Sequence, residues 1–468
     1  MRPEVKEYNF DTLLWHVLDV GHKSLDSTEK EIRWLGDYVP YYDRIIDTWA
    51  REGRVGKLFL EMVWQYMDNI KTAHDRGRKL AVTTFCFSPA VFYAMDIVPV
   101  MLEALTTLAC LVWKRGTVDY LDYCVEAGFT ETGCSAQRGA LGAYLAGLGE
   151  DIDMVVCDTP GVCDTNAMAY AFAAAYLDKP FYQLDYPPAL VEDRSSAYHR
   201  EDYKGLIAFL EAQTGKKLDV DQLREIVTEY EKQDELIGEL EDMQRMIPSP
   251  MPSIYNLVIY AGRYFFGGAP EYTRVLGAMV EACSQRTARG LSGMRHGEEK
   301  IRALFCYIDH FTVDFDFWNW LEENGICQVG SLLKAFFTPQ TPVIKEGFQE
   351  AGYALRTDSR EAMIDSLAQM NARMPMVNVI RGPYYRPYMW LELTLQVART
   401  VKPDCIIYSG TPGCRNTWGM VRPYMHDLEK NGYPTHIMNS DAFDFRVESW
   451  QSSTDRLEEF LKVRGLIQ

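Results

Sequence analysis

Apolar residues recur along this chain in two patterns, which predict buried strands and amphipathic helices. Short apolar runs bounded by Pro, Gly or Asp are typical of strands that are buried on both faces. Helical spacing follows several of these runs, as in 315–324, 388–401 and 418–431. Strands and helices that alternate in this way favour parallel sheets with crossover helices. The predicted strands are 79–86, 153–157, 180–186, 301–308, 376–380, 404–409 and 435–438.

Two further regions show helical spacing without strands. Residues 1–75 place apolar side chains such as Trp49 and Met62 on helical stripes, and 217–246 forms another stripe before MIPSPMPS interrupts it. We therefore predict an α/β protein with two Rossmann- or flavodoxin-like parallel-sheet domains joined by helices. The expected units are an N-terminal helical region at 1–75, a first α/β domain at 76–215, a helical connector at 216–298 and a second α/β domain at 299–468.

The composition narrows the classes of function. The chain has 66 acidic and 48 basic side chains, and its net charge of −18 disfavours nucleic acid as a partner. The first apolar stretch contains acidic residues, and no uncharged apolar run reaches the length of a membrane span. We expect a cytoplasmic, unprocessed protein without membrane or nucleic-acid partners.

Eleven cysteines make thiol chemistry the main candidate for function. A reducing cytoplasm favours free, catalytic or metal-bound cysteines over disulfides, and the sequence contains no CxxC pair and no HExxH. Cys163 and Cys414 each follow a predicted strand and a Thr-Pro-Gly turn, so they are expected at the ligand-binding edges of the two sheets. Cys134 precedes a helix rich in small residues, where backbone N–H groups favour a thiolate.

Three such thiolates are enough to hold an iron–sulfur cube by three of its corners. The fourth iron would then be open to water or to a substrate oxygen, where it would combine Lewis acidity with electron transfer. The alternative is that these cysteines are ordinary small apolar residues of the core. Cys86, at the end of a predicted strand, is either an additional ligand or such a core thiol.

Six segments of the chain, taken in order, carry a recognisable pattern: GCSAQRGALGAY, DTPGVCDTNAMAYAFAAAY, KPFYQLDYPP, EAQTGKKLDVDQLREIVTEY, PDCIIYSGTPGCRNTW and SDAFDFRVESWQSSTDRLEEF. In their order and spacing they resemble the 2-hydroxyacyl-CoA dehydratase and benzoyl-CoA reductase family, and most closely the larger of its two cluster-bearing subunits. The resemblance extends over most of the chain from about residue 75. It assigns the cluster ligands of the family to Cys134, Cys163 and Cys414.

The resemblance also implies a reaction and its partners. The cofactor would be a [4Fe–4S] cluster, either alone or joined to a second cluster, and the substrate a CoA thioester. An ATP-dependent iron–sulfur activator would supply single electrons, and the partner would be a second cluster-bearing subunit or a second copy of the chain. The product would arise either by radical dehydration of a 2-hydroxyacyl-CoA or by stepwise reduction of an aromatic ring.

One departure from the family pattern favours the reductase among these reactions. Many members have a Glu in a P-x-E run after the first strand, and here Val91 stands in its place. The aromatic residues of HFTVDFDFWNW, including Phe315, Phe317, Trp318 and Trp320, either line a flat acyl pocket or pack into the second domain. Arg381 and Arg386 either meet CoA or form an interdomain turn. We thus expect an aryl- or acyl-CoA reductase subunit resembling benzoyl-CoA reductase. The alternatives are a 2-hydroxyacyl-CoA dehydratase, a non-catalytic electron relay, and a zinc-stabilised or metal-free binding protein.

Overall fold

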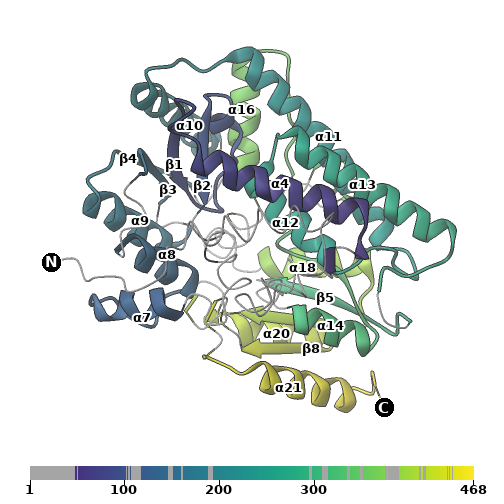
Figure 1. Ribbon diagram of the computed structural model, residues 1–468. Coiled ribbons are helices and arrows are strands. Elements are labelled where there is room, and N and C mark those ends of the chain that lie inside the picture. The colour runs from purple at the N-terminus through teal and green to yellow at the C-terminus, as the bar shows by residue number, and fades with distance from the viewer. Residues whose placement is uncertain are drawn as a thin grey trace, which may run out of the picture.

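The computed structural model shows two parallel sheets with helices around them (Figure 1). It describes residues 48–49, 51–101, 103, 106, 118–145, 151–159, 162–187, 193–294, 298–307, 315–334, 338–347, 352–374, 377, 389–410, 413–414, 418–439, 441, 443–444 and 446–467.

Within these residues, each sheet has four strands, and all of the strand pairs are parallel. The order is β2-β1-β3-β4 in the first sheet and β6-β5-β7-β8 in the second, so the two sheets share one topology. This arrangement confirms the predicted fold class of two parallel-sheet α/β domains. The strands are β1 Lys79–Thr83, β2 Ile97–Met101, β3 Met154–Asp158, β4 Phe181–Leu184, β5 Ile301–Tyr307, β6 Ile326–Ser331, β7 Cys405–Gly410 and β8 Thr435–Asn439.

The shared topology places one switch point in each sheet. In the first sheet the chain leaves β1 to one side, towards β2, and later returns to the other side of β1 as β3. The same reversal occurs around β5, with β6 and β7 as its neighbours. Open parallel sheets bind their ligands outside the carboxyl ends of the strands at such points. The residues that follow β1 and β3, and those that follow β5 and β7, are therefore the first candidates for a site.

The apolar runs locate six of the eight described strands, within a few residues at their ends. The predicted strand at 376–380 lies almost wholly outside the described residues. The patterns missed β2 and β6. Pro99 interrupts the β2 run, and Gln328 and Gly330 make β6 less apolar than its neighbours, although both strands are fully buried. Both strands depend on pairing with a distant strand, β2 with β1 and β6 with β5, and a short sequence window does not reveal such pairing.

The helices lie around and between the sheets (Figure 1). Helix α16 comes from the predicted second domain, yet it packs against α10 and α11 and adds Met363 and Leu367 to the core beside the first sheet. The described helices are α4 Arg54–Lys71, α5 Ala90–Tyr93, α7 Val118–Glu126, α8 Ser135–Leu145, α9 Asp164–Tyr176, α10 Asp193–Thr214, α11 Val220–Gln244, α12 Ile254–Phe266, α13 Pro270–Ala288, α14 Phe315–Glu323, α15 Pro342–Lys345, α16 Arg360–Asn371, α18 Met389–Val401, α20 Val421–Lys430 and α21 Trp450–Val463.

Helices α4, α11, α12 and α13 share an apolar core of their own. The stripe predicted for α11 is buried as expected, with Leu223, Val227 and Leu240 fully covered. Helix α4 packs along α13, and the hydroxyl of Tyr66 donates to the carbonyl of Pro99 in β2 at 3.1 Å. The helical layer is thereby attached to the edge of the first sheet.

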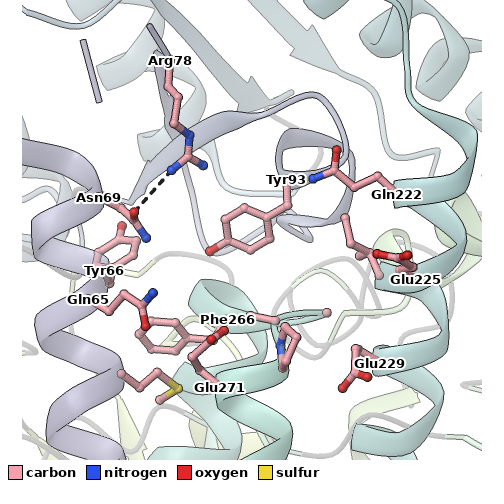
Figure 2. A pocket seen from close by; sticks show the side chains of 15 residues that line it. Gln65, Tyr66, Asn69, Arg78, Tyr93, Gln222, Glu225, Glu229, Phe266 and Glu271 are labelled. Atoms are coloured by element: carbon pink, nitrogen blue, oxygen red, sulfur yellow. Dashed lines mark hydrogen bonds between the residues drawn. The ribbon is translucent and has the colours of Figure 1, made fainter. Parts of the chain in front are cut away.

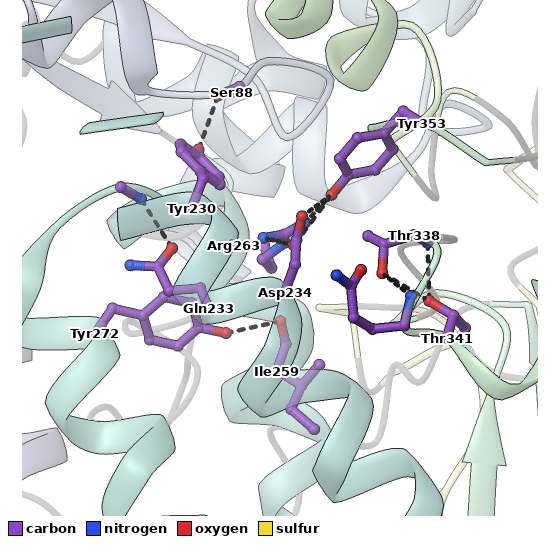
Figure 3. Close-up of polar contacts among 12 residues, drawn as sticks. Ser88, Tyr230, Gln233, Asp234, Ile259, Arg263, Tyr272, Thr338, Thr341 and Tyr353 are labelled. Carbon is purple, nitrogen blue, oxygen red and sulfur yellow. Dashed lines mark hydrogen bonds and ion pairs between the residues drawn. The ribbon is translucent and has the colours of Figure 1, made fainter. Parts of the chain in front are cut away.

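A buried polar network crosses this helical layer. Arg263 of α12 pairs with Asp234 of α11 at 2.5 Å, and the hydroxyl of Tyr353 lies 3.2 Å from both carboxylate oxygens (Figure 3). One turn earlier on α11, the hydroxyl of Tyr230 lies 2.8 Å from that of Ser88, in the loop after β1. Burying an unpaired polar group destabilises the folded state, so these contacts must form together. They attach α11 and α12 to the loop after β1 through Ser88 and to the later part of the chain through Tyr353.

No described helix has the length and the apolar character of a membrane span.

Candidate functional site

The three predicted cysteines occupy corresponding places in the fold. Cys163 follows β3 and Cys414 follows β7, and each of these strands is the third in its sheet. Cys134 lies directly before α8, the helix that leads towards β3. Cys163 and Cys414 thus follow equivalent strands, as expected from the Thr-Pro-Gly sequence that precedes each of them. Thr411, Pro412, Pro160 and Gly161 themselves lie outside the described residues.

Exposure separates these three cysteines from the others. Among the ten cysteines that the structure describes, Cys134, Cys163 and Cys414 are partly exposed, whereas the other seven are buried. Free cysteines are usually among the most buried residues, where they act as small apolar groups. The packing interpretation therefore suits the seven others, Cys86 included, better than it suits these three.

Cys163 forms the N-cap of α9. Its sulfur accepts the backbone N–H of Asn166 at 3.5 Å, and its own N–H donates to Oδ2 of Asp158 at 3.1 Å. Its extended backbone allows the chain to turn from the strand into the helix. The cap directs the sulfur to the N-terminus of α9, where N–H groups and the helix dipole stabilise negative charge.

Cys134 has a corresponding local setting at α8. The backbone N–H groups of Ala136 and Gln137 act on its sulfur and lower its pKa, but the surrounding protein displaces water from this partly exposed thiol, which outweighs them and raises the pKa to about 12. The nearby Asp441 and Cys414 raise it further. The same loss of surrounding water raises the pKa of Cys163 well above its ordinary value, with contributions from Asp158, Cys414 and Cys134. The three thiols are thus close enough to influence one another.

Direct contacts join the two halves of the chain beside these cysteines. The N–H of Phe443 donates to the hydroxyl of Ser135, the first residue of α8, at 3.1 Å. On the same helix, Arg138 lies 3.8 Å from the carboxylate of Asp444. These contacts bring the segment after β8 onto the N-terminus of α8, so the two halves of the chain meet beside Cys134.

The donor set suits an iron–sulfur cluster better than a single ion. Among the described residues, no three His, Cys, Asp or Glu side chains come close enough to bind one metal ion. A tetrahedral ion would need its sulfur donors at about 2.3 Å from one point. An iron–sulfur cube binds each cysteine through a different iron, so its ligands can lie farther apart. Three partly exposed thiols from different segments fit this second arrangement.

Sequence reasoning missed the buried polar groups beneath Cys163. Asp158, the last residue of β3, has no exposed surface, and burial raises its pKa to about 6. Its Oδ1 accepts from Thr84 and from the side-chain amide of Asn166, both at 3.3 Å. The same amide lies 3.9 Å from the sulfur of Cys86. The sequence did offer a signal for this group of buried polar side chains, because Asp158 ends an apolar strand directly before a Thr-Pro-Gly turn.

A second buried acid, Glu103, was also missed. It follows β2, at the same end of the sheet, and burial raises its pKa to about 7. The hydroxyl of Tyr170 donates to it at 2.8 Å and the amide of Gln137 at 3.3 Å. Tyr170 belongs to α9 and Gln137 to α8, the helices that begin directly after Cys163 and Cys134. Glu103 therefore connects these two helices through hydrogen bonds.

The aromatic run and Val91 lie elsewhere in the fold. Val91 is fully buried in α5, and Phe317 and Trp318 pack against Phe305 in the core of the second sheet. Trp320 packs against the same core while it is partly buried. Phe317 and Trp318 are thus packing residues, not the walls of an acyl pocket.

Three other candidates fall outside the part of the chain that the structure describes. These are Arg381, Arg386 and the side chain of Phe315. Their predicted roles in binding CoA or an acyl group stay predictions.

A separate cavity of about 280 Å³ lies between α4, α11 and the start of α13 (Figure 2). Three carboxylates line it, those of Glu225, Glu229 and Glu271. Among its described lining residues the one arginine, Arg78, pairs with Asp96 at 2.8 Å. Carboxylates repel phosphate groups, so this cavity is poorly suited to CoA.

The fold is that of an α/β protein with two parallel-sheet halves and a partly exposed cysteine after the third strand of each sheet. Residues 84–463 match the family described as 2-hydroxyglutaryl-CoA dehydratase, D-component. The chain belongs to this family, as the resemblance predicted, and it is a 2-hydroxyacyl-CoA dehydratase-type component. The family acts with a partner component on a CoA-linked substrate. A comparison with curated proteins gives no match.

Proposed function

We propose that the chain is the cluster-bearing component of a 2-hydroxyacyl-CoA dehydratase. In this proposal Cys134, Cys163 and Cys414 hold a [4Fe–4S] cluster between the two sheets. One observation carries it: these three cysteines alone among those described are partly exposed, and they gather beside the switch points of a chain that belongs to the dehydratase family.

The groups around the cysteines position them. When bound, the cluster supplies one-electron transfer and, at an iron that no cysteine holds, a Lewis acid. The carboxylate of Asp158 accepts the backbone N–H of Cys163 and so fixes the position of this residue. Backbone N–H groups at the start of α8 and α9 point at the sulfurs of Cys134 and Cys163. Ser135 and Phe443 fix the second half of the chain against the first.

Glu103 is our candidate for the acid that is missing at position 91. Dehydration removes a β-proton, and a positioned base typically contributes about 10²- to 10⁴-fold to such a step. A carboxyl group with a pKa of about 7 can hold or accept a proton at neutral pH. Its contacts with Gln137 and Tyr170 place it beneath α8 and α9, so a proton from the site would reach it through a hydrogen-bonded water.

The partners follow from the family. We propose a second cluster-bearing component and an ATP-dependent iron–sulfur activator, with all three proteins in the cytoplasm. Reduction of an aryl-CoA is the second candidate reaction, and Val91 in place of the family acid favours it. The burial of Phe317 and Trp318 removes the other argument for an aromatic substrate.

The test uses the chain reconstituted anaerobically with iron and sulfide. We expect stoichiometric iron and acid-labile sulfide. With the partner component, the activator and ATP, we expect enoyl-CoA from 2-hydroxyacyl-CoA thioesters. Ring reduction of benzoyl-CoA without any enoyl-CoA would establish the reductase instead. A chain that binds neither iron nor sulfide would refute the cluster.

A further inference from the structure

Arg138 holds the residue pair Gly133 and Cys134 at three points. Its Nε donates to the carbonyl oxygen of Gly133 at 3.0 Å, and its backbone N–H donates to the carbonyl oxygen of Cys134 at 3.0 Å. Its side-chain carbons lie over Gly133, where an added Cβ would meet Cγ at 3.8 Å and Cδ at 3.9 Å. The side chain of Arg138 is only 8% exposed. The position of Cys134 therefore depends on this side chain as well as on the first turn of α8.

The charge of this guanidinium is matched by the second half of the chain. Nη2 of Arg138 lies 3.8 Å from Oδ2 of Asp444, a buried residue that follows β8. Moving a charged side chain from water into the protein is unfavourable unless an opposite charge lies near it. Arg138 thus has its hydrogen-bond acceptors in the first half of the chain and its counter-charge in the second.

A second arginine fixes the orientation of Asp444. Arg446 donates from Nε to Oδ1 of Asp444 at 2.8 Å and from Nη2 to Oδ2 at 2.9 Å, which is the bidentate geometry that suits a guanidinium and a carboxylate. Its Nη1 donates to Oδ1 of Asp122 in α7 at 2.7 Å. Helix α7 packs against α8, so the network returns to the first half of the chain beside Arg138 (Figure 1).

We propose that Arg138 is a positioning residue that sets the place of Cys134 in the cluster site, and that Asp444 makes this position depend on contact between the two halves of the chain. The inference rests on the proposed function for the role of Cys134 as a ligand. Cys134 and Cys163 belong to the first half and Cys414 to the second, so a site shared by the three forms only where the halves meet. The pair of Arg138 and Asp444 ties the loop that carries Cys134 to this meeting.

Two substitutions at position 138 separate the hydrogen bond from the charge. Arg138→Lys keeps a positive charge that can face Asp444, but its single ammonium group cannot also reproduce the donation from Nε to Gly133. Arg138→Met keeps much of the length of the side chain and removes both the charge and the donor. Each variant should therefore release the residue pair Gly133 and Cys134, whereas only Arg138→Met should also lose the attraction to Asp444.

The test measures backbone hydrogen exchange, peptide by peptide, in the metal-free, full-length chain. We expect both variants to speed exchange in the peptide that contains Cys134 by about tenfold, because a hydrogen bond to a charged group is lost there. Exchange in the peptide that contains Cys163 should keep its rate and serves as the internal reference. Arg194→Lys is the matched control, because Arg194 is an exposed arginine at the start of α10, and it should change neither peptide. Unchanged exchange around Cys134, or an equal rise in both peptides, overturns the positioning role.

Asp444→Asn tests the link to the second half of the chain. The amide keeps the shape of the carboxylate without its charge, so exchange around Cys134 should rise again, by less than in Arg138→Met because the bond to Gly133 remains. Unchanged exchange in Asp444→Asn would overturn the dependence on the second half.

The same variants are then reconstituted anaerobically with iron and sulfide. We expect the cluster that still forms in the two Arg138 variants to give an altered electron paramagnetic resonance spectrum when reduced. A lower iron content with an unaltered spectrum would show a merely structural role and overturn the proposal. Absence of a cluster from the unsubstituted chain would refute the proposed function, whereas hydrogen exchange, measured without metal, would still decide whether Arg138 positions Cys134.

Discussion

Gly413 and Gly133 touch through their backbones. A Cβ atom on Gly413 would lie 3.0 Å from the carbonyl carbon and oxygen of Gly133 and 3.1 Å from the backbone nitrogen of Cys134. Each glycine directly precedes a proposed ligand, Cys414 or Cys134. The contact thus sets how closely the loop after β7 can approach the start of α8.

Gly413→Ala is expected to separate these two loops. Overpacking of a tight contact costs about 1–3 kcal/mol, and here the opposing atoms are backbone atoms that cannot rotate away. We expect less iron and sulfide per chain after anaerobic reconstitution. Gly133→Ala is the control, because its Cβ would meet nothing nearer than Cγ of Arg138 at 3.8 Å. Equal iron contents in the two variants would contradict the prediction.

Replacing a proposed ligand should abolish the cluster while the fold is kept. Cys134→Ala, Cys163→Ala and Cys414→Ala should each lose the visible absorption and the sulfide of the cluster. Cys283→Ala is the comparison, since Cys283 is buried in the core of the helical layer. It should retain the cluster and lose about 1 kcal/mol of stability from the small cavity. An intact cluster in Cys414→Ala would remove this residue from the site.

Glu103 should make the protein less stable as the pH rises. Its pKa of about 7 in the folded chain exceeds the usual 4.5, so between these values the folded state binds more protons than the unfolded state. The free energy of unfolding therefore falls over this interval, by at most about 3 kcal/mol from this group. Tyr144, Tyr170 and Asp158 are among the ionisable groups that face it.

Glu103→Gln tests this dependence. The amide remains neutral and can still meet Gln137 and Tyr170, so the variant should lose part of the decline between about pH 4.5 and 7. Denaturant unfolding at several pH values measures it. Glu126→Gln, an exposed change on α7, should follow the unchanged chain. If the free energy of unfolding of Glu103→Gln varied with pH in the same way as that of the unchanged chain, the pKa of Glu103 would not be raised in the folded protein.

The ion pair between Asp234 and Arg263 should be essential to the helical layer. Asp234→Ala leaves a fully buried guanidinium without its carboxylate, which costs about 3–5 kcal/mol. Glu239→Ala removes an exposed acid from the same helix and should change the free energy of unfolding by less than about 0.5 kcal/mol. Urea unfolding distinguishes the two, and a similar small loss in both would mean that the buried pair contributes little.

The sequence alone predicted the features that depend on local patterns of residues, namely most of the strands and the fold class. Apolar runs located β1, β3, β5 and β7, because a strand buried on both faces must be apolar over its whole length. They also located β4 and β8, which are only partly buried. The fold class followed from the alternation of these strands with helices. The family resemblance, which the match over 84–463 confirms, assigned the cluster to Cys134, Cys163 and Cys414, and this assignment stays a prediction.

Tertiary structure decided what depends on contacts between distant segments. Strands β2 and β6 form because they pair with β1 and β5. The local sequence around Pro99 and Gln328 does not predict this pairing. The role of Glu103 depends on Gln137 and Tyr170, which lie 34 and 67 residues away. Burial raises the pKa of an acid only when other elements cover it, so such groups remain invisible until the chain is folded.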